Sequence, residues 1–207
     1  MLNCTTEKYD KLYARWLESP GTLLDLGGYD PKADSLLDLC GGTGAVSLEA
    51  LRRGGDKNKV CLLDLNPRCP DSRVWQITGN VNMEQRWADS YDLTLVVCRQ
   101  SMGYLDLFCV GYVVAQMLGI GGRFVFNTFE EPRWKLEPYS YQGHWFLEAA
   151  WSLGTHVFHV QAAPGVGLDL THFRYWTEED VREAMDFWFT IKLVQEGHSL
   201  RWLCTRK

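Results

Sequence analysis

The sequence predicts an α/β fold with a doubly wound, mostly parallel sheet. Before Pro132, short apolar segments alternate with segments of helical periodicity. Strands that alternate with helices are typical of parallel βαβ units. Three glycines also lie in the turn Cys-Gly-Gly-Thr-Gly, residues 40–44, between the first apolar segment and the helical segment after it. Open parallel sheets bind ligands at such strand-to-helix turns, so this turn is the first candidate for a functional site.

The composition is that of one globular domain. The chain has 207 residues, of which 46% are apolar and 23% charged, and its net charge is -5. These values fit a single domain with a real core. The acidic balance disfavours a large nucleic-acid surface, and no nucleic-acid partner is expected. Nine Trp, nine Tyr and nine Phe fit either a bulky core or an aromatic-lined ligand cavity.

Several features indicate a cytoplasmic protein without a membrane segment. The first residues, MLNCTTEKYDKL, have neither the basic flank nor the apolar core of a signal peptide. The most apolar stretch, 107–120, is interrupted by Gln116 and is shorter than the ~20 residues of a membrane span. The seven cysteines form no C-x-x-C pair, which is typical of reduced thiols in the cytoplasm. His156 and His159 would lie on opposite faces of a strand, so no metal site is predicted.

The parallel part of the sheet is expected to contain five strands. Two helices between them, 45–53 and 107–118, are expected to end at the glycine pairs Gly54-Gly55 and Gly121-Gly122. The apolar segments expected to form the strands are 35–39, 60–65, 73–77, 91–98 and 123–129.

Further elements are predicted at the two ends of the chain. The apolar residues of 9–17 share one face of a helix, which Ser19-Pro20-Gly21 is expected to end before a short linker. Thr177-Glu178-Glu179-Asp180 reads as a capping box that opens a helix. The segments 187–195 and 200–207 are expected to form a closing antiparallel hairpin, which brings the main sheet to seven strands.

The pattern changes after Pro132. Residues 144–151, 155–161 and 168–176 read as three strands with short connections. No helix separates them, so they are expected to be antiparallel. We therefore expect a single domain over 1–207, in which residues 131–176 are an inserted antiparallel lid.

The glycine turn and an acidic residue downstream favour a nucleoside ligand. Glycine adopts backbone angles that other residues avoid, and its missing Cβ lets a ligand touch the main chain. Asp64 lies 20 residues after Gly44, at the end of the second strand, where a carboxylate can accept both hydroxyls of a ribose. Ser47 stands where a dinucleotide site has its third glycine, which disfavours a nicotinamide cofactor. A tight turn without a ligand and a solvated strand end remain the alternatives.

Four segments resemble the motifs of class I S-adenosylmethionine-dependent methyltransferases. "LLDLCGGTG" (36–44) resembles the first motif, and "LLDLNP" (62–67) resembles the second. "YDLTLVVCRQSMGYL" (91–105) and "MLGIGGRFVFNTF" (117–129) resemble the fourth strand with its loop and the stretch into the fifth strand. The resemblance covers nearly the whole chain and is strongest to the small-molecule branch, which includes amino-sugar and glycine-type N-methyltransferases. It implies a Rossmann-like fold and S-adenosyl-L-methionine as the cofactor.

The resemblance also implies a set of cofactor-binding residues. Cys40 replaces the usual first glycine of the loop, which a small side chain permits. Asn80 stands where the family commonly has an acid near the adenine amino group, and its amide oxygen can accept from that amine. Tyr9 and Tyr13 either close over the cofactor or form a packed helix face. The residues expected to bind the cofactor are Tyr9, Tyr13, Asp38, Cys40, Gly41, Gly42, Gly44, Asp64, Leu65, Asn66, Asn80, Val81, Cys98 and Arg99.

The resemblance places the methyl acceptor between the lid and the loop 99–104. Candidate catalytic residues are His144, His172 and Tyr104, although surface or core positions would also explain the two histidines. The aromatic residues of the lid either line the acceptor pocket or pack within the lid. The residues expected to bind the substrate are Gln100, Ser101, Trp134, Trp145 and Tyr175.

The function predicted from the sequence is methyl transfer from S-adenosylmethionine to a small polar metabolite by in-line displacement. The nucleophile would be nitrogen or oxygen, with an amine favoured. A nucleic-acid methyltransferase is disfavoured, because 98–101 reads Cys-Arg-Gln-Ser instead of Asn/Asp-Pro-Pro-aromatic. A peptide or protein methyltransferase, a non-catalytic S-adenosylmethionine-binding protein and a homodimer are left open.

Overall fold

The structure is a computed structural model of the chain. It describes residues 18–81, 93–129, 137–141, 144–153, 156–163, 167–174, 176–196 and 199–207. For residues 129, 195, 196 and 199 and for the strands between 137 and 174, it describes the backbone alone.

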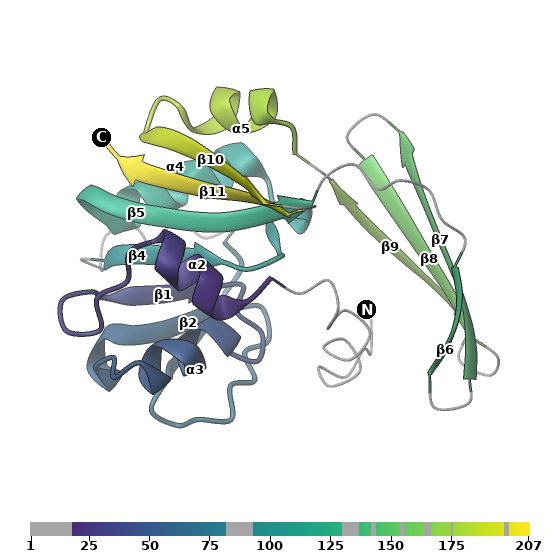
Figure 1. Ribbon diagram of the computed structural model, residues 1–207, viewed down its shortest axis with the longest axis horizontal. Helices are drawn as coiled ribbons and strands as arrows, with labels where there is room; N and C mark the ends of the chain where they lie inside the picture. The colour runs from purple at the N-terminus through teal and green to yellow at the C-terminus, as the bar shows by residue number, and fades with distance from the viewer. Residues whose placement is uncertain are drawn as a thin grey trace.

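The main sheet has seven strands in the order β10-β11-β5-β4-β1-β2-β3 (Figure 1). The five strands from β5 to β3 are parallel, and β11 and β10 are antiparallel to their neighbours. Because β1 lies between β2 and β4, the direction of winding reverses at β1, and ligands bind at such a switch point. The seven-stranded, mostly parallel sheet confirms the predicted fold. Its strands are β1 Leu36–Leu39, β2 Val60–Asp64, β3 Trp75–Thr78, β4 Leu93–Cys98, β5 Leu118–Phe129, β10 Phe189–Glu196 and β11 Ser199–Arg206.

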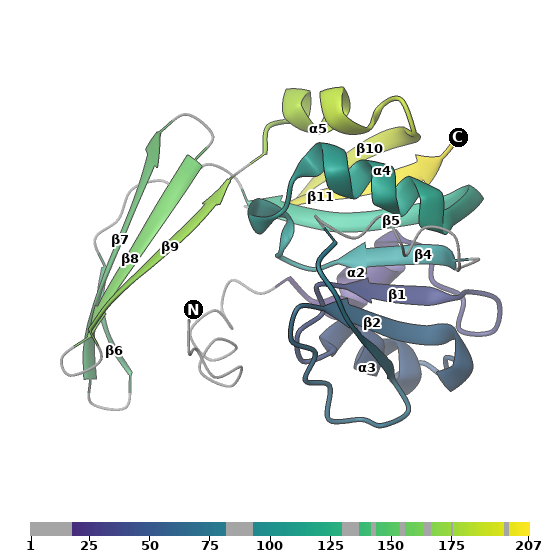
Figure 2. The same cartoon turned by 180° about the vertical axis from the view of Figure 1, so that it is seen from behind.

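Helices cover both faces of this sheet, as Figures 1 and 2 show. Two helices, α2 Pro20–Leu26 and α3 Ala45–Arg52, pack on one face. On the other face lie α4 Leu107–Met117 and α5 Glu178–Met185. Neighbouring strand residues alternate between the two layers: Leu36 packs with α2 and α3, whereas Leu37 packs with α4. Burial on both faces explains the continuous apolar runs of the central strands. Two 3₁₀ turns complete the described helices, η1 Lys57–Lys59 and η3 Met102–Tyr104.

Two predictions about element ends are wrong. The short linker expected after Ser19-Pro20-Gly21 is absent from this position, because Pro20 is the first residue of α2, whereas the helix predicted over 9–17 lies outside the described residues. Proline suits this place, since its missing N–H would have no partner in the first turn. Gly121 and Gly122 do not separate α4 from the next strand, because β5 begins at Leu118. They lie where β5 shifts its register against β4, and Gly121 has a φ of 79°.

The ends of the chain otherwise agree with the sequence. The Thr177 hydroxyl accepts from Asp180 N at 3.2 Å, and Asp180 Oδ2 accepts from Thr177 N at 2.9 Å, so the predicted capping box is present. The closing hairpin is formed by β10 and β11.

A second sheet contains four antiparallel strands in the order β6-β7-β8-β9. Their bounds are β6 Glu137–Tyr141, β7 His144–Leu153, β8 His156–Ala163 and β9 Gly167–Arg174. The predicted antiparallel arrangement is confirmed, and β6 is an additional strand that was not predicted. This sheet stands beyond the carboxyl ends of β4 and β5, with β9 against η3 (Figures 1 and 2). A role as a lid over an acceptor stays a prediction.

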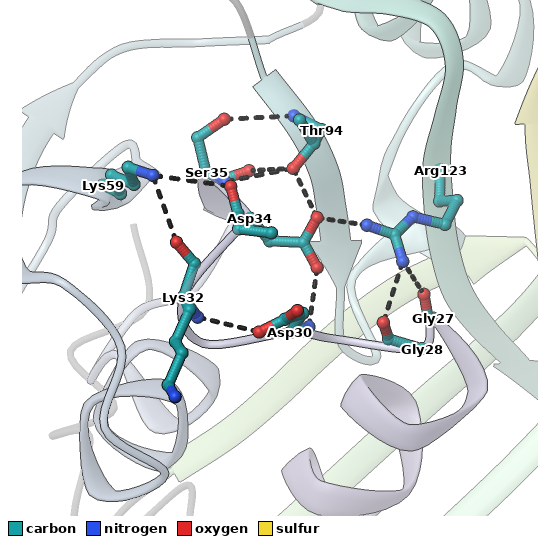
Figure 3. A network of polar contacts seen from close by, with 10 residues as sticks. Gly27, Gly28, Asp30, Lys32, Asp34, Ser35, Lys59, Thr94 and Arg123 are labelled. Carbon is teal, nitrogen blue, oxygen red and sulfur yellow. Dashed lines mark hydrogen bonds and ion pairs between the residues drawn. The ribbon is translucent and has the colours of Figure 1, made fainter.

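A polar network closes the opposite, amino edge of the main sheet (Figure 3). Asp34 Oδ1 accepts from Thr94 Oγ1 at 2.7 Å and pairs with Arg123, while Oδ2 accepts from Asp30 N at 2.8 Å. Arg123 also donates to the carbonyl oxygens of residues 27 and 28. The network joins β4 and β5 to the segments before β1, and both carboxylate oxygens of buried Asp34 are bonded.

Candidate cofactor and acceptor site

The glycine turn joins β1 to α3, and its glycines have different neighbours. A Cβ on Gly41 would lie 2.5 Å from Asp38 Cγ, and one on Gly44 would lie 2.7 Å from Cys69 Sγ. Internal packing therefore explains the lack of a side chain at these two positions. Apart from its chain neighbours, no atom of the described residues lies within 4 Å of the Cβ position of Gly42, whose φ is 52°. Gly42 thus faces open space, as expected for a backbone that a ligand approaches.

Asp64 lies directly beside this turn. Its Oδ2 accepts from Gly42 N at 3.0 Å and its Oδ1 accepts from Asn66 N at 2.8 Å. A carboxylate has about four lone-pair sites, so each oxygen can accept one more hydrogen bond. The predicted pair of a glycine turn and a strand-end acid is therefore brought together. Next to Asp64, the Leu65 side chain is 68% exposed.

The end of β3 lies beside Asp64. Gly79 N donates to the Asp64 carbonyl oxygen at 3.0 Å. Asn80, which follows, is half-buried, and Val81 is buried. The residues predicted for the adenine end of a cofactor thus lie next to the predicted ribose acid.

Asp38 lies beneath the turn and not on its surface. Its residue is only 1% exposed, and its Oδ2 accepts from Ser47 N at 3.0 Å and from Ser47 Oγ at 3.1 Å. Burial raises the pKa of Asp38 to about 6, although the Ser47 hydrogen bonds and the charge of Arg99 lower it in part. Asp38 Oδ1 has no hydrogen-bond partner within the described part of the chain. Asp38 and Ser47 therefore hold the start of α3 against the end of β1.

The carboxyl end of β4 meets the glycine turn. Ser101 Oγ donates to the Cys40 carbonyl oxygen at 3.4 Å. Cys98 is fully buried, and its contact with the Cys40 thiol, together with burial, raises the pKa of the Cys98 thiol. Cys40 itself has a φ of 55°, the left-handed conformation that suits the glycine it replaces.

The loop after β4 reaches toward β5 and β11. Arg99 Nη1 donates to the Glu18 carbonyl oxygen at 3.3 Å. The Glu18 carboxylate pairs with Arg201, with Nε to Oε2 at 2.9 Å. Gln100 is buried with a φ of 61°, whereas Tyr104 is exposed. Arg99, Gln100, Ser101 and Tyr104 therefore share this edge with the glycine turn, as predicted.

Two buried polar residues of β5 were not predicted. Asn127 Oδ1 accepts from Gln100 N at 2.9 Å, and Thr128 Oγ1 accepts from Trp202 Nε1 at 3.0 Å. The residues Asn127 and Thr128 are 2% and 4% exposed. An Asn-Thr pair at the end of an otherwise apolar strand is the signal that could have identified them.

The remaining predicted site residues cannot be placed at this edge. His144 begins β7 opposite Tyr141, and His172 lies in β9 opposite Phe158, with only the backbone described. The same holds for Trp145 in β7. Tyr9, Tyr13, Trp134 and Tyr175 lie outside the described residues. Their proposed roles stay predictions.

In the described ranges, no three His, Cys, Asp or Glu side chains gather as a metal site would require. None of the described helices combines the length and apolarity needed to span a membrane.

Comparisons with known proteins extend this description of the fold. No protein-family model matches the sequence, and no curated protein matches it. An S-adenosylmethionine-dependent methyltransferase from Clostridium acetobutylicum has a similar structure, with a TM-score of 0.72 and 14% sequence identity. The similarity covers 97% of this chain and 96% of that chain. The fold is that of S-adenosylmethionine-dependent methyltransferases. A TehB-like methyltransferase from Corynebacterium glutamicum is 17% identical, with a TM-score of 0.60 and coverages of 97% and 95%.

A third similar structure contains the cofactor. The glycopeptide N-methyltransferase MtfA, complexed with S-adenosylmethionine, has a TM-score of 0.62 at 13% identity, with coverages of 93% and 96%. At these identities the likeness establishes the fold, so the activity has to be argued from the residues of the site.

Proposed function

We propose that this protein is an S-adenosylmethionine-dependent methyltransferase that acts on a small polar metabolite, with an amine favoured over a hydroxyl. The observation that carries the proposal is the pair formed by Gly42 and Asp64 at the switch point of the sheet. The backbone of Gly42 is not covered at its Cβ position by any described side chain beyond its chain neighbours, and its N–H donates to the carboxylate of Asp64. A nucleoside needs both features, one for close approach and one for its ribose hydroxyls.

The residues at this edge fit the parts of S-adenosylmethionine. Asp64 would accept from the ribose hydroxyls, while exposed Leu65 and half-buried Asn80 lie where an adenine ring would extend. The turn 40–44 and the start of the loop at Arg99 would hold the amino-acid end. Ser47 fills the place of the third glycine of a dinucleotide site and bonds Asp38 instead.

When bound, the sulfonium of the cofactor supplies an electrophilic methyl group. The task of the chain is then to hold an acceptor nucleophile in line with the S–CH3 bond and to exclude water. The loop 99–104 is tied to the glycine turn through Ser101 and to β5 through Gln100, so it can hold an acceptor at a constant distance from the cofactor. A neutral amine needs little base catalysis. A hydroxyl acceptor would need a general base, for which Tyr104, His144 and His172 are the candidates.

A small acceptor in the cytoplasm fits the other features of the molecule. The net charge of -5 opposes binding to a nucleic acid, and the second sheet stands beyond the edge where an acceptor would bind. Six cysteines of the described chain are free thiols, which supports a reducing compartment.

Two experiments test the proposal. Titration calorimetry should show binding of S-adenosylmethionine and S-adenosylhomocysteine but not of NAD. Tight binding of NAD without binding of either sulfur ligand would overturn it. A panel of amines, amino acids and hydroxylated metabolites with a labelled methyl donor then tests the transfer. Cofactor binding without transfer to any acceptor, including peptides and nucleic acids, would instead indicate a non-catalytic binding protein.

A further inference from the structure

Asn127 is a buried polar residue at the carboxyl edge of the sheet, and part of its amide has no hydrogen-bond partner in the described chain. It lies near the end of β5, one residue beyond Phe126, which pairs with Cys98 at the end of β4. Its residue is 2% exposed, and an uncharged polar side chain so deeply buried needs hydrogen-bond partners.

The orientation of the Asn127 amide follows from its neighbour. Gln100 N lies 2.9 Å from the amide, and a backbone N–H can only donate, so the atom facing it is Oδ1. Nδ2 therefore points elsewhere, with two N–H donors. No acceptor in the described part of the chain bonds to this buried nitrogen. Leaving such a donor without a partner is unfavourable, which favours a partner from outside the described residues, such as a bound ligand.

Both edges of the sheet contain buried polar side chains. At the amino edge, both oxygens of the buried Asp34 carboxylate are bonded (Figure 3). Buried side-chain atoms without a partner in the described chain are Asp38 Oδ1, Asn127 Nδ2 and the Tyr29 hydroxyl. The Tyr29 hydroxyl lies near Asp34 at the amino edge, whereas Asp38 Oδ1 and Asn127 Nδ2 lie at the carboxyl ends of β1 and β5, the edge where open α/β sheets bind their ligands.

The position of Asn127 distinguishes the cofactor from the acceptor. In the sheet order, β4 separates β5 from β1, and β2 lies on the far side of β1. Neighbouring strands are about 4.8 Å apart, so Asn127 lies roughly two strand spacings from the glycine turn and three from the ribose acid. A group that bonds Asn127 therefore lies on the acceptor side of the cofactor.

The chemistry around Asn127 selects the class of ligand. An amide N–H can only donate, and oxygen atoms are the commonest acceptors. Arg99 lies next to Gln100, and within the described chain its guanidinium donates to a carbonyl oxygen, that of Glu18. The Glu18 carboxylate is itself paired with Arg201. The positive charge of Arg99, which also acts on Asp38, favours an oxygen that carries negative charge.

We propose that Asn127 is a substrate-binding residue, whose Nδ2 donates to a carbonyl or carboxylate oxygen of the methyl acceptor. This inference rests on the proposed function and adds the class of acceptor: a molecule with such an oxygen near its nucleophile, as in an amino acid or an amide. Asn127 positions the acceptor and takes no part in proton transfer.

The test observes the Asn127 side chain directly. In the ¹⁵N-labelled protein, the NH2 pair of Asn127 is assigned by its loss in Asn127→Asp, or in Asn127→Thr if the first variant does not fold. The full chain is saturated with S-adenosylhomocysteine and titrated with sodium acetate and with acetamide. Sodium chloride and methylammonium chloride are the controls. Both oxygen ligands should move the Asn127 pair saturably in the millimolar range, acetate more than acetamide, and the controls should not.

A second amide in the same spectrum serves as an internal control. Asn58 is exposed, and its Nδ2 already donates to Asp56 Oδ1 at 3.1 Å, so its NH2 pair should stay in place. The proposal is overturned if the Asn127 pair ignores both oxygen ligands. It is equally overturned if S-adenosylhomocysteine moves the pair and 5′-methylthioadenosine does not, because the partner would then be the carboxylate of the cofactor. Failure of S-adenosylhomocysteine to bind would be seen by calorimetry and would overturn the proposed function instead.

Discussion

Gly42 N donates to Asp64 Oδ2 at 3.0 Å, which joins residues 22 positions apart without any ligand. The bond holds the acid at the end of β2 against the turn at the end of β1. A site assembled before binding loses less conformational freedom when its ligand arrives. The same bond makes both residues testable, because each has a proposed ligand contact that can be separated from its structural role.

Replacement of Asp64 should weaken the cofactor complex. Asp64→Ala removes the proposed acceptor of the ribose hydroxyls, and hydrogen bonds to a charged group contribute about 1.5–3 kcal/mol. Titration calorimetry with S-adenosylhomocysteine measures the change. Asp71→Ala is the control, since Asp71 lies on the loop between β2 and β3 and pairs with Arg73; its affinity should equal that of the wild type. Equal affinity in Asp64→Ala would remove Asp64 from the site.

Gly42 and Gly54 form a matched pair for testing the glycine turn. Both have a positive φ, 52° and 92°, and neither Cβ position has an atom of another described residue, beyond its chain neighbours, within 4 Å. Alanine at each should destabilise the fold by similar amounts, on the order of 1 kcal/mol, because of the left-handed backbone. Only Gly42→Ala should also lose affinity for S-adenosylhomocysteine, with a larger loss for Gly42→Val. Full affinity in Gly42→Val would show that this glycine serves the turn alone.

Cys40 should be less favourable than glycine at its position. Its φ is 55°, where a side chain costs roughly 1–2 kcal/mol. To exclude the effect of the thiol, Cys40→Gly is compared with Cys40→Ala, and the glycine variant should be more stable by about 1 kcal/mol in urea unfolding. Exposed Glu183 within α5 is the control position. There Glu183→Gly should be less stable than Glu183→Ala, because glycine is about 1 kcal/mol less favourable than alanine inside a helix. A more stable alanine variant at position 40 would contradict the argument.

Local patterns were sufficient to predict the strands of the main sheet, the glycine turn and the capping box. Each is encoded by residues close in sequence, such as Thr177 and Asp180. The start of α2 was missed because proline can end a helix or occupy its first turn, and residues 18–26 contain no long apolar period to decide between them.

The parts of the site that could not be predicted depend on contacts between distant residues. Gln100 and Asn127 are 27 positions apart, and they meet because β4 pairs with β5. Asp38 was predicted to contact the cofactor from its place in a motif, but its bonds to Ser47 direct it beneath the turn. No local pattern separates a strand-end acid that faces a ligand, such as Asp64, from one that supports the backbone from below.

Asp38 should make the stability of the unliganded protein fall with rising pH. Its pKa is about 6 in the folded chain because of burial, against ~3.9 in an unfolded chain. Between about pH 4 and pH 6 the folded state therefore binds more protons than the unfolded state, and stability declines as pH rises. Above pH 6 the cost of the buried charge is fully present, whereas below pH 4 it is absent. One pKa unit corresponds to about 1.4 kcal/mol, so this cost is on the order of 3 kcal/mol.

Asp38→Asn isolates this contribution. The amide oxygen can still accept from Ser47 N and Oγ, but the side chain does not titrate. The free energy of unfolding of the variant minus that of the wild type should rise by about 3 kcal/mol from pH 4 to pH 7, as measured by urea unfolding at several pH values. Other titrating groups cancel in this difference because both proteins contain them. Glu179→Gln is the control for a carboxyl-to-amide change at an exposed position. A flat difference for Asp38→Asn would show that the Asp38 carboxyl is not desolvated in the folded protein, and that water or another group reaches its unpaired Oδ1 in solution.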